Sequence, residues 1–69
     1  MDNSEKIRSL LKQYRYERSR QDQCYWDGKN EQRQDLKTHH YEKEREHADT
    51  AKYLKSLLLE LGVDAEKSI

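Results

Sequence analysis

Apolar residues recur along the first part of this chain at the three- and four-residue steps of an amphipathic helix. The residues of this first stripe are Ile7, Leu10, Leu11, Tyr14, Arg18, Gln21 and Tyr25. The stripe is therefore aliphatic at its start, polar in its middle and aromatic at its end. Its spacing predicts a helix over about residues 4–27, with Asn3 or Ser4 as the N-terminal cap.

A second stripe follows with a heptad-like spacing that becomes more apolar toward its end. Its residues are Leu36, His40, Lys43, His47, Thr50 or Ala51, Leu54, Leu57 or Leu58, and Leu61. This pattern predicts a second helix over about residues 31–61.

The chain contains no proline, and its two glycines, Gly28 and Gly62, lie on either side of the second stripe. Glycine ends helices because it adopts the left-handed conformation at little cost. We therefore expect Gly28 to stop the first helix in a turn over residues 27–30, with Asn30 as the next cap. Gly62 is expected to end the second helix.

These elements predict an all-α antiparallel helical hairpin in a single domain over residues 1–69. No internal repeat or low-complexity segment suggests a second unit. Residues 62–69 contain few apolar anchors, so they are expected to form a frayed tail.

The expected register leaves the leucine-rich end of the second helix without a partner. If the turn centres on Gly28, Ile7 faces Thr50, and residues beyond about Tyr53 extend past the first helix. A chain of 69 residues, of which 32% are apolar, also buries little surface alone. We therefore expect a homodimeric four-helix bundle in which these leucines meet the turn region of a second copy. The expected interface residues are Tyr25, Trp26, Leu54, Leu57, Leu58 and Leu61.

An alternative fold buries the same leucines within one chain. The second helix then breaks near residues 47–50, with Asp49 or Thr50 as a new cap, and its last segment folds back to give a three-helix fold. Because this break requires a sharp turn without glycine or proline, the dimer is the favoured prediction.

Charge is unevenly distributed along a chain whose formal net charge is zero. Residues 5–20 contain six basic and two acidic residues, a local charge of +4. Basic side chains around an outward-facing tyrosine suit an acidic protein surface, and they also suit phosphate contact with base stacking. The candidate partner-binding residues are Arg8, Lys12, Arg15, Tyr16 and Arg20. A protein partner is the first expectation, and RNA or another nucleic acid is the alternative.

A metal site is the remaining chemical candidate. His40, Glu44 and His47 lie at i, i+4 and i+7, and Glu44 and His47 have the Glu-x-x-His spacing of di-iron helical bundles. Such sites need further carboxylates from facing helices, whereas the first stripe supplies Arg18, and Lys43 lies on the same face. We therefore expect no metal and no cofactor, and we interpret the two histidines as polar seam residues that fix the register.

No enzyme motif is present, because the chain lacks a glycine-rich phosphate loop and a strand–turn–helix for a nucleophile. Because it has no apolar run of transmembrane length and no signal-like pattern, we expect neither a membrane span nor a signal peptide. The lone Cys24 cannot form an internal disulfide and is expected to be a small buried residue. The sequence thus predicts a non-enzymatic, cytoplasmic interaction or regulatory protein.

Overall fold

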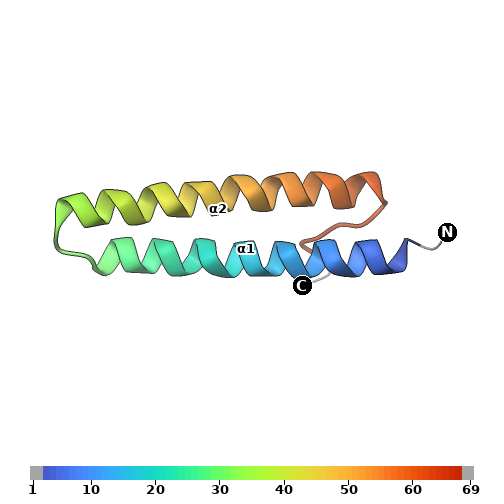
Figure 1. The fold of residues 1–69 in the computed structure, drawn as a ribbon, viewed down its shortest axis with the longest axis horizontal. Helices are drawn as coiled ribbons and strands as arrows, with labels where there is room; N and C mark the ends of the chain where they lie inside the picture. Colours follow the sequence, from blue (N-terminus) through green and yellow to red (C-terminus); the bar gives the residue numbers. More distant parts are fainter. Residues whose placement is uncertain (1–2, 68–69) are drawn as a thin grey trace.

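The computed structural model describes residues 3–67, which form two antiparallel α-helices and a returning tail (Figure 1). Helix α1 spans Ser4–Asn30 and helix α2 spans Gln34–Glu60, so both contain 27 residues. They pack side by side in a rod with extents of 51 × 16 × 16 Å. The predicted all-α helical hairpin is confirmed.

Helix α2 is continuous across residues 47–50, where the three-helix alternative requires a break. Thr50 does not cap a new helix, since its Oγ1 donates a hydrogen bond to the Glu46 carbonyl one turn earlier. Asp49 also lies inside α2. The three-helix alternative is therefore wrong, because no residue here interrupts the hydrogen bonds of the helix.

The turn lies further along the chain than predicted, at residues 31–33. Helix α1 continues through Gly28, which is buried, and ends at Asn30, which therefore does not cap α2. A Cβ atom on Gly28 would lie 2.8 Å from Cε1 of Tyr41, which is closer than carbon atoms pack. Gly28 thus allows close approach of the two helices instead of ending the first one.

The later turn changes the register of the hairpin. Nδ1 of His47 lies 2.6 Å from Oε2 of Glu17, and Ile7 borders the cluster that contains Leu58 instead of facing Thr50. The leucine-rich end of α2 therefore lies beside the first turns of α1 (Figure 1). The overhang that favoured a dimer does not exist in this register.

Alternating steps of three and four residues mark the seam between the helices, as in coiled coils. The buried and half-buried seam residues are Ile7, Leu10, Tyr14, Glu17, Gln21, Cys24 and Gly28 on α1, with His40, Glu44, His47, Ala51, Leu54 and Leu58 on α2 and Leu61 just after it. The seam is apolar at one end of the rod and polar toward the loop.

Five residues assigned to the stripes from the sequence are exposed instead, namely Arg18, Tyr25, Leu36, Lys43 and Thr50. Because the seam steps alternate between three and four residues, Glu17 lies in the seam instead of Arg18, and Cys24 lies there instead of Tyr25. The expectation that Cys24 is a small buried residue is confirmed.

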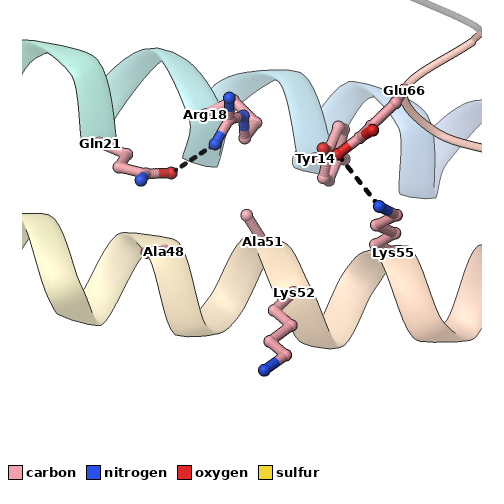
Figure 2. A pocket seen from close by; sticks show the side chains of 8 residues that line it. All are labelled: Tyr14, Arg18, Gln21, Ala48, Ala51, Lys52, Lys55 and Glu66. Carbon is pink, nitrogen blue, oxygen red and sulfur yellow. Dashed lines mark hydrogen bonds and ion pairs between the residues drawn. The ribbon is translucent and has the colours of Figure 1, made fainter.

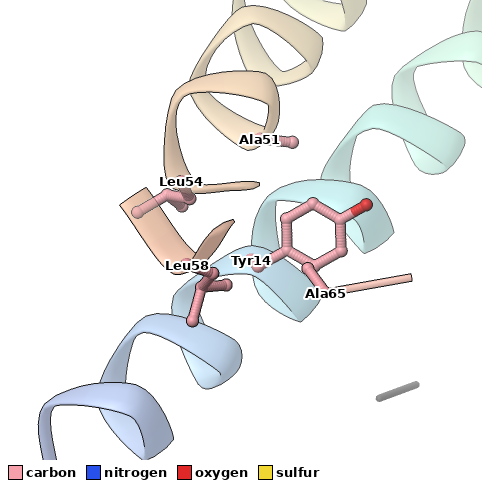
Figure 3. Close-up of a cluster of buried hydrophobic side chains, with 5 residues drawn as sticks. All are labelled: Tyr14, Ala51, Leu54, Leu58 and Ala65. Carbon is pink, nitrogen blue, oxygen red and sulfur yellow. The ribbon is translucent and has the colours of Figure 1, made fainter. Parts of the chain in front are cut away.

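The hydrophobic core lies at the apolar end of the seam (Figure 3). Its members are Tyr14, Ala51, Leu54, Leu58 and Ala65, with Ile7, Leu10, Leu11, Leu57 and Val63 packed against them. Tyr14 is 3% exposed and Leu58 is fully buried. Of the predicted interface leucines, Leu54 and Leu58 are thus buried within the hairpin, and Leu57 and Leu61 are half-buried there. A second copy is not needed to bury them.

Residues 61–67 turn back from the end of α2 and cross to α1 (Figure 1). Gly62 has a φ angle of 81°, and the N–H groups of Gly62 and Val63 donate to the carbonyls of Leu59 and Leu58, respectively. This is the hydrogen-bond pattern with which a left-handed glycine closes a helix. The prediction that Gly62 ends the second helix is confirmed.

The returning tail is anchored at several points, whereas the sequence predicts a frayed tail over residues 62–69. Ala65 is fully buried in the core. Oε1 of Glu66 lies 3.0 Å from Nζ of Lys55, and this hydrogen bond raises the pKa of Lys55. Oδ1 of Asp64 accepts the Glu66 N–H at 3.0 Å. Gly62 directs the chain back over the core, which a straight extension of α2 could not reach; residues 68–69 lie outside the described residues.

The intramolecular burial of the leucines predicts a specific loss of stability. Leu58→Ala leaves a cavity in the core, so the free energy of unfolding should fall by about 2–5 kcal/mol. Leu59→Ala, the matched control, removes the same atoms from a side chain that is 55% exposed, and its effect should stay within roughly 0.5 kcal/mol. Urea denaturation followed by far-UV circular dichroism measures both values. Equal losses for the two variants would contradict the observed register.

Candidate interaction surface

The five predicted partner-binding residues lie together on the side of α1 that faces away from α2. This α1 outer face consists of Arg8, Lys12, Arg15, Tyr16 and Arg20, all of which are exposed. The ring of Tyr16 is 59% exposed, so it is accessible from solution among the basic side chains. The surface is convex because a single helix forms it.

The α1 outer face is positive because of where Glu17 lies. Glu17 is the only acidic residue between Lys6 and Arg20. Its carboxylate turns into the seam against His47, and the two side chains are 19% and 24% exposed, respectively. Every other charged side chain of this stretch is basic. The seam contact therefore keeps the only carboxylate of this stretch away from the α1 outer face.

The outward side of α2 carries the opposite charge. Its exposed acidic residues are Asp35, Glu42, Glu46, Asp49 and Glu60. Two of them form ion pairs: Asp35 with Arg33 at 3.1 Å and Glu46 with Lys43 at 3.2 Å. The hairpin thus presents opposite charges on its two long sides, although its formal net charge is zero.

A second basic surface, which sequence reasoning missed, runs along one edge of both helices. The cations of this basic flank are Arg8, Arg15, Arg18 and Lys29 from α1 and Arg45, Lys52 and Lys55 from α2. Residues seven apart, such as Arg8 and Arg15, lie on one face of a helix. The rows of the two helices adjoin, since Arg18, Lys52 and Lys55 line one hollow (Figure 2).

The carboxylates on or beside the basic flank are Asp22, Glu42 and the tail residues Asp64 and Glu66, which are fewer than the seven cations. The sequence does not predict this surface, because the spacing places Arg18 in the buried stripe. The signal was nonetheless present, because Arg45 and Lys52 are seven residues apart, as are Arg8 and Arg15.

Three hollows follow the basic flank. The first has a volume of about 190 Å³ and lies between the helices, where Ala48 and Ala51 project little from α2 (Figure 2). Beside it, Nη1 of Arg18 donates to Oε1 of Gln21 at 2.9 Å. A second hollow of about 330 Å³ is lined by Ser4, Ile7, Arg8, Leu11 and Arg15. A third of about 290 Å³ is lined by Thr38, Tyr41, Glu42 and Arg45.

Aromatic side chains cluster at the loop end of the rod. The rings of Tyr25 and Trp26 meet edge to face at 5.5 Å between centroids, and the rings of Tyr25 and Tyr41 are 6.5 Å apart. Nζ of Lys29 lies 5.1 Å from the centroid of Trp26, within cation–π range. All three rings are exposed. The predicted dimer interface is thus divided into exposed aromatic residues near the loop and buried leucines near the other end.

The metal candidates lie along the seam with separate partners. His47 contacts Glu17, and Nε2 of His40 lies 3.9 Å from Oε2 of Glu31. Within residues 3–67, no three histidine, cysteine or acidic side chains are grouped so that they could hold a metal ion. His40, Glu44 and His47 therefore do not form a metal centre with other described residues.

Comparison with protein-family models, curated proteins and solved structures finds no match to this chain. In the part of the chain that the structure describes, no helix has an apolar stretch long enough to cross a bilayer.

The seam contact between Glu17 and His47 predicts a measurable coupling. A double-mutant cycle of Glu17→Ala and His47→Ala should give about 0.5–3 kcal/mol, because both side chains are largely buried. The exposed pair Lys43 and Glu46 provides a control cycle, expected to give about 0.3–0.5 kcal/mol. Chemical denaturation of each variant supplies the free energies. A Glu17–His47 coupling no larger than that of the control pair would rule out the seam contact as a fixed feature.

Proposed function

We propose that this protein is a non-enzymatic interaction module that binds an acidic surface of another protein through the α1 outer face. The observation that carries this proposal is the inward position of Glu17, which leaves a basic surface around Tyr16. These side chains spread over a convex helix instead of converging in a cavity. That arrangement favours docking of a macromolecule over binding and conversion of a small substrate.

The shape of the rod supports the need for a partner. The chain exposes 5500 Å², whereas a compact monomer of its mass, 8.4 kDa, exposes roughly 4,600 Å². Exposed Tyr25 and Trp26 near the loop provide a surface on which a second copy could pack. We therefore retain the homodimer as part of the proposal, with contacts through these aromatic residues instead of the leucines.

The lone Cys24 supports a location inside the cell. Its thiol is buried and forms no disulfide in the described chain. Such a residue suits a reducing compartment, where structural disulfides are rare.

Charge reversal on the α1 outer face tests the proposal. Lys12→Glu/Arg20→Glu and Tyr16→Ala should leave the melting temperature nearly unchanged and weaken partner capture by roughly tenfold or more. Lys6→Glu/Lys43→Glu reverses the same number of charges elsewhere and should capture the partner normally. Each variant serves as bait in a nuclease-treated lysate of the source cell, with quantitative mass spectrometry as readout. Unchanged capture by the outer-face variants would contradict the proposal.

RNA binding is the second candidate function, and the exposure of Tyr16 among arginine and lysine side chains favours it specifically. If RNA is the partner, material captured from a lysate that has not been treated with nuclease should disappear after ribonuclease treatment. A plot of log affinity against log salt concentration should then have a shallower slope for Lys12→Glu/Arg20→Glu. The slope should decrease by about 0.7–0.9 for each lost phosphate contact.

A further inference from the structure

We propose that the hollow between α1 and α2 on the basic flank, together with the adjoining helix surfaces that lead from it to the loop, accepts a third helix, and that this helix is an acidic amphipathic segment of the partner protein. This hollow and the surfaces that continue it are called the groove. The proposal rests on the proposed function and specifies the partner's chemistry. It assigns a different contact surface from the α1 outer face, with Arg8 and Arg15 shared between the two.

The groove has a free length that suits a helix. Near the core, the returning tail covers it, since Ala65 is buried beside Tyr14 and Glu66 reaches Lys55 (Figures 2 and 3). Beyond the tail, no described segment covers the groove up to the ring pair of Tyr25 and Tyr41. From Arg15 to Lys29 this distance is about 21 Å at 1.5 Å per residue, which is close to four helical turns.

The floor of the groove is shaped for side chains of a packed helix. Ala48 and Ala51 project little from α2 and leave the hollow of about 190 Å³ between the helices. Tyr25 and Tyr41 provide an apolar surface at the loop end, where both rings are partly exposed. Small residues at one level and large ones at the next leave space for apolar side chains of a packed helix at these two places.

The tail itself demonstrates the kind of sequence that this groove holds. Ala65 inserts an apolar side chain against Tyr14, and the adjacent Glu66 places its carboxylate 3.0 Å from Nζ of Lys55. An apolar residue beside an acidic one is thus the pattern already bound at one end of the groove. A partner helix with the same pattern would continue this packing toward the loop.

Cations that lack carboxylate partners border the open part of the groove. Within residues 3–67, neither Arg18 nor Lys52 forms an ion pair; Arg18 donates instead to the neutral amide of Gln21. Figure 2 shows Lys52 extending away from α1, at the outer border of the hollow. Carboxylates on the two sides of an amphipathic helix could pair with both borders, which gives charge complementarity. The two alanines at the hollow and the tyrosine rings near the loop are apolar contacts that such a helix can use and that the phosphates of a nucleic acid cannot.

The experiment uses the full chain and a synthetic peptide of about four helical turns, with leucine and alanine on one face and glutamate elsewhere. Titration calorimetry should detect binding to the wild-type protein. Arg18→Glu/Lys52→Glu should weaken it by roughly tenfold or more, and Lys6→Glu/Lys43→Glu, on the opposite edge, should change it by less than about twofold. A peptide with lysine in place of every glutamate should not bind.

A second variant tests the groove without changing charge. Ala48→Leu fills the hollow between the helices and should weaken the same peptide severalfold, while circular dichroism checks that the hairpin remains folded. Methyl NMR signals of Ala48 and Ala51 should shift on addition of the peptide to the wild-type protein. The exposed substitution Ser56→Leu, on the outward side of α2, is the matched control and should leave affinity unchanged.

The other outcomes separate this inference from the proposed function. If Lys12→Glu/Arg20→Glu abolishes peptide binding and Arg18→Glu/Lys52→Glu does not, the helix docks on the α1 outer face; the inference fails and the proposed function stands. The same holds if no peptide binds while partner capture still depends on Lys12 and Arg20. Binding of single-stranded oligouridine, but of neither peptide, would overturn both.

Discussion

The position of the turn is the constraint on which the rest of the hairpin depends. With the connection at residues 31–33, the two helices have equal length and their ends coincide. Two contacts are compatible with this register alone: the approach of Tyr41 to Gly28 near the loop and the 2.6 Å contact of Glu17 with His47 at mid-length. Because a shift by one position would turn another set of side chains inward, these polar and steric contacts specify the alignment that the apolar residues stabilise.

This alignment divides the rod into two unequal halves. In the apolar half, two helices cannot enclose Tyr14 and Leu58 without help, so the tail supplies Ala65 and Val63 as a third wall. In the other half, Gln21, Cys24 and His40 lie in the seam and no third wall is present among the described residues. Fewer large apolar side chains are therefore buried toward the loop, and the rings of Tyr25 and Tyr41, which a third helix would cover, remain partly exposed.

The sequence was sufficient for the number, class and approximate extent of the elements because these depend on local spacing. Ile7, Leu10 and Tyr14 form a helical face in any register, and Gly62 ends a helix through its own backbone. The sequence places the turn too early because a glycine can either end a helix or allow a neighbouring ring to approach closely. The spacing alone does not show which of these roles Gly28 has. That single error propagated to the register, the leucine overhang and the interface assigned to Leu54 and Leu58.

The candidate surfaces show the same division between local and nonlocal information. The α1 outer face could be predicted because Lys12, Tyr16 and Arg20 lie four residues apart on one helix. The basic flank could not, since it requires knowing which edge of α2 adjoins Arg18, and only the register decides that. In this register the inward Glu17 removes a carboxylate from α1 at the same level at which Ala48 leaves space on α2. The contact that aligns the helices therefore leaves a basic surface at the level of the hollow, and these are the two features on which the proposed acidic, apolar-striped partner depends.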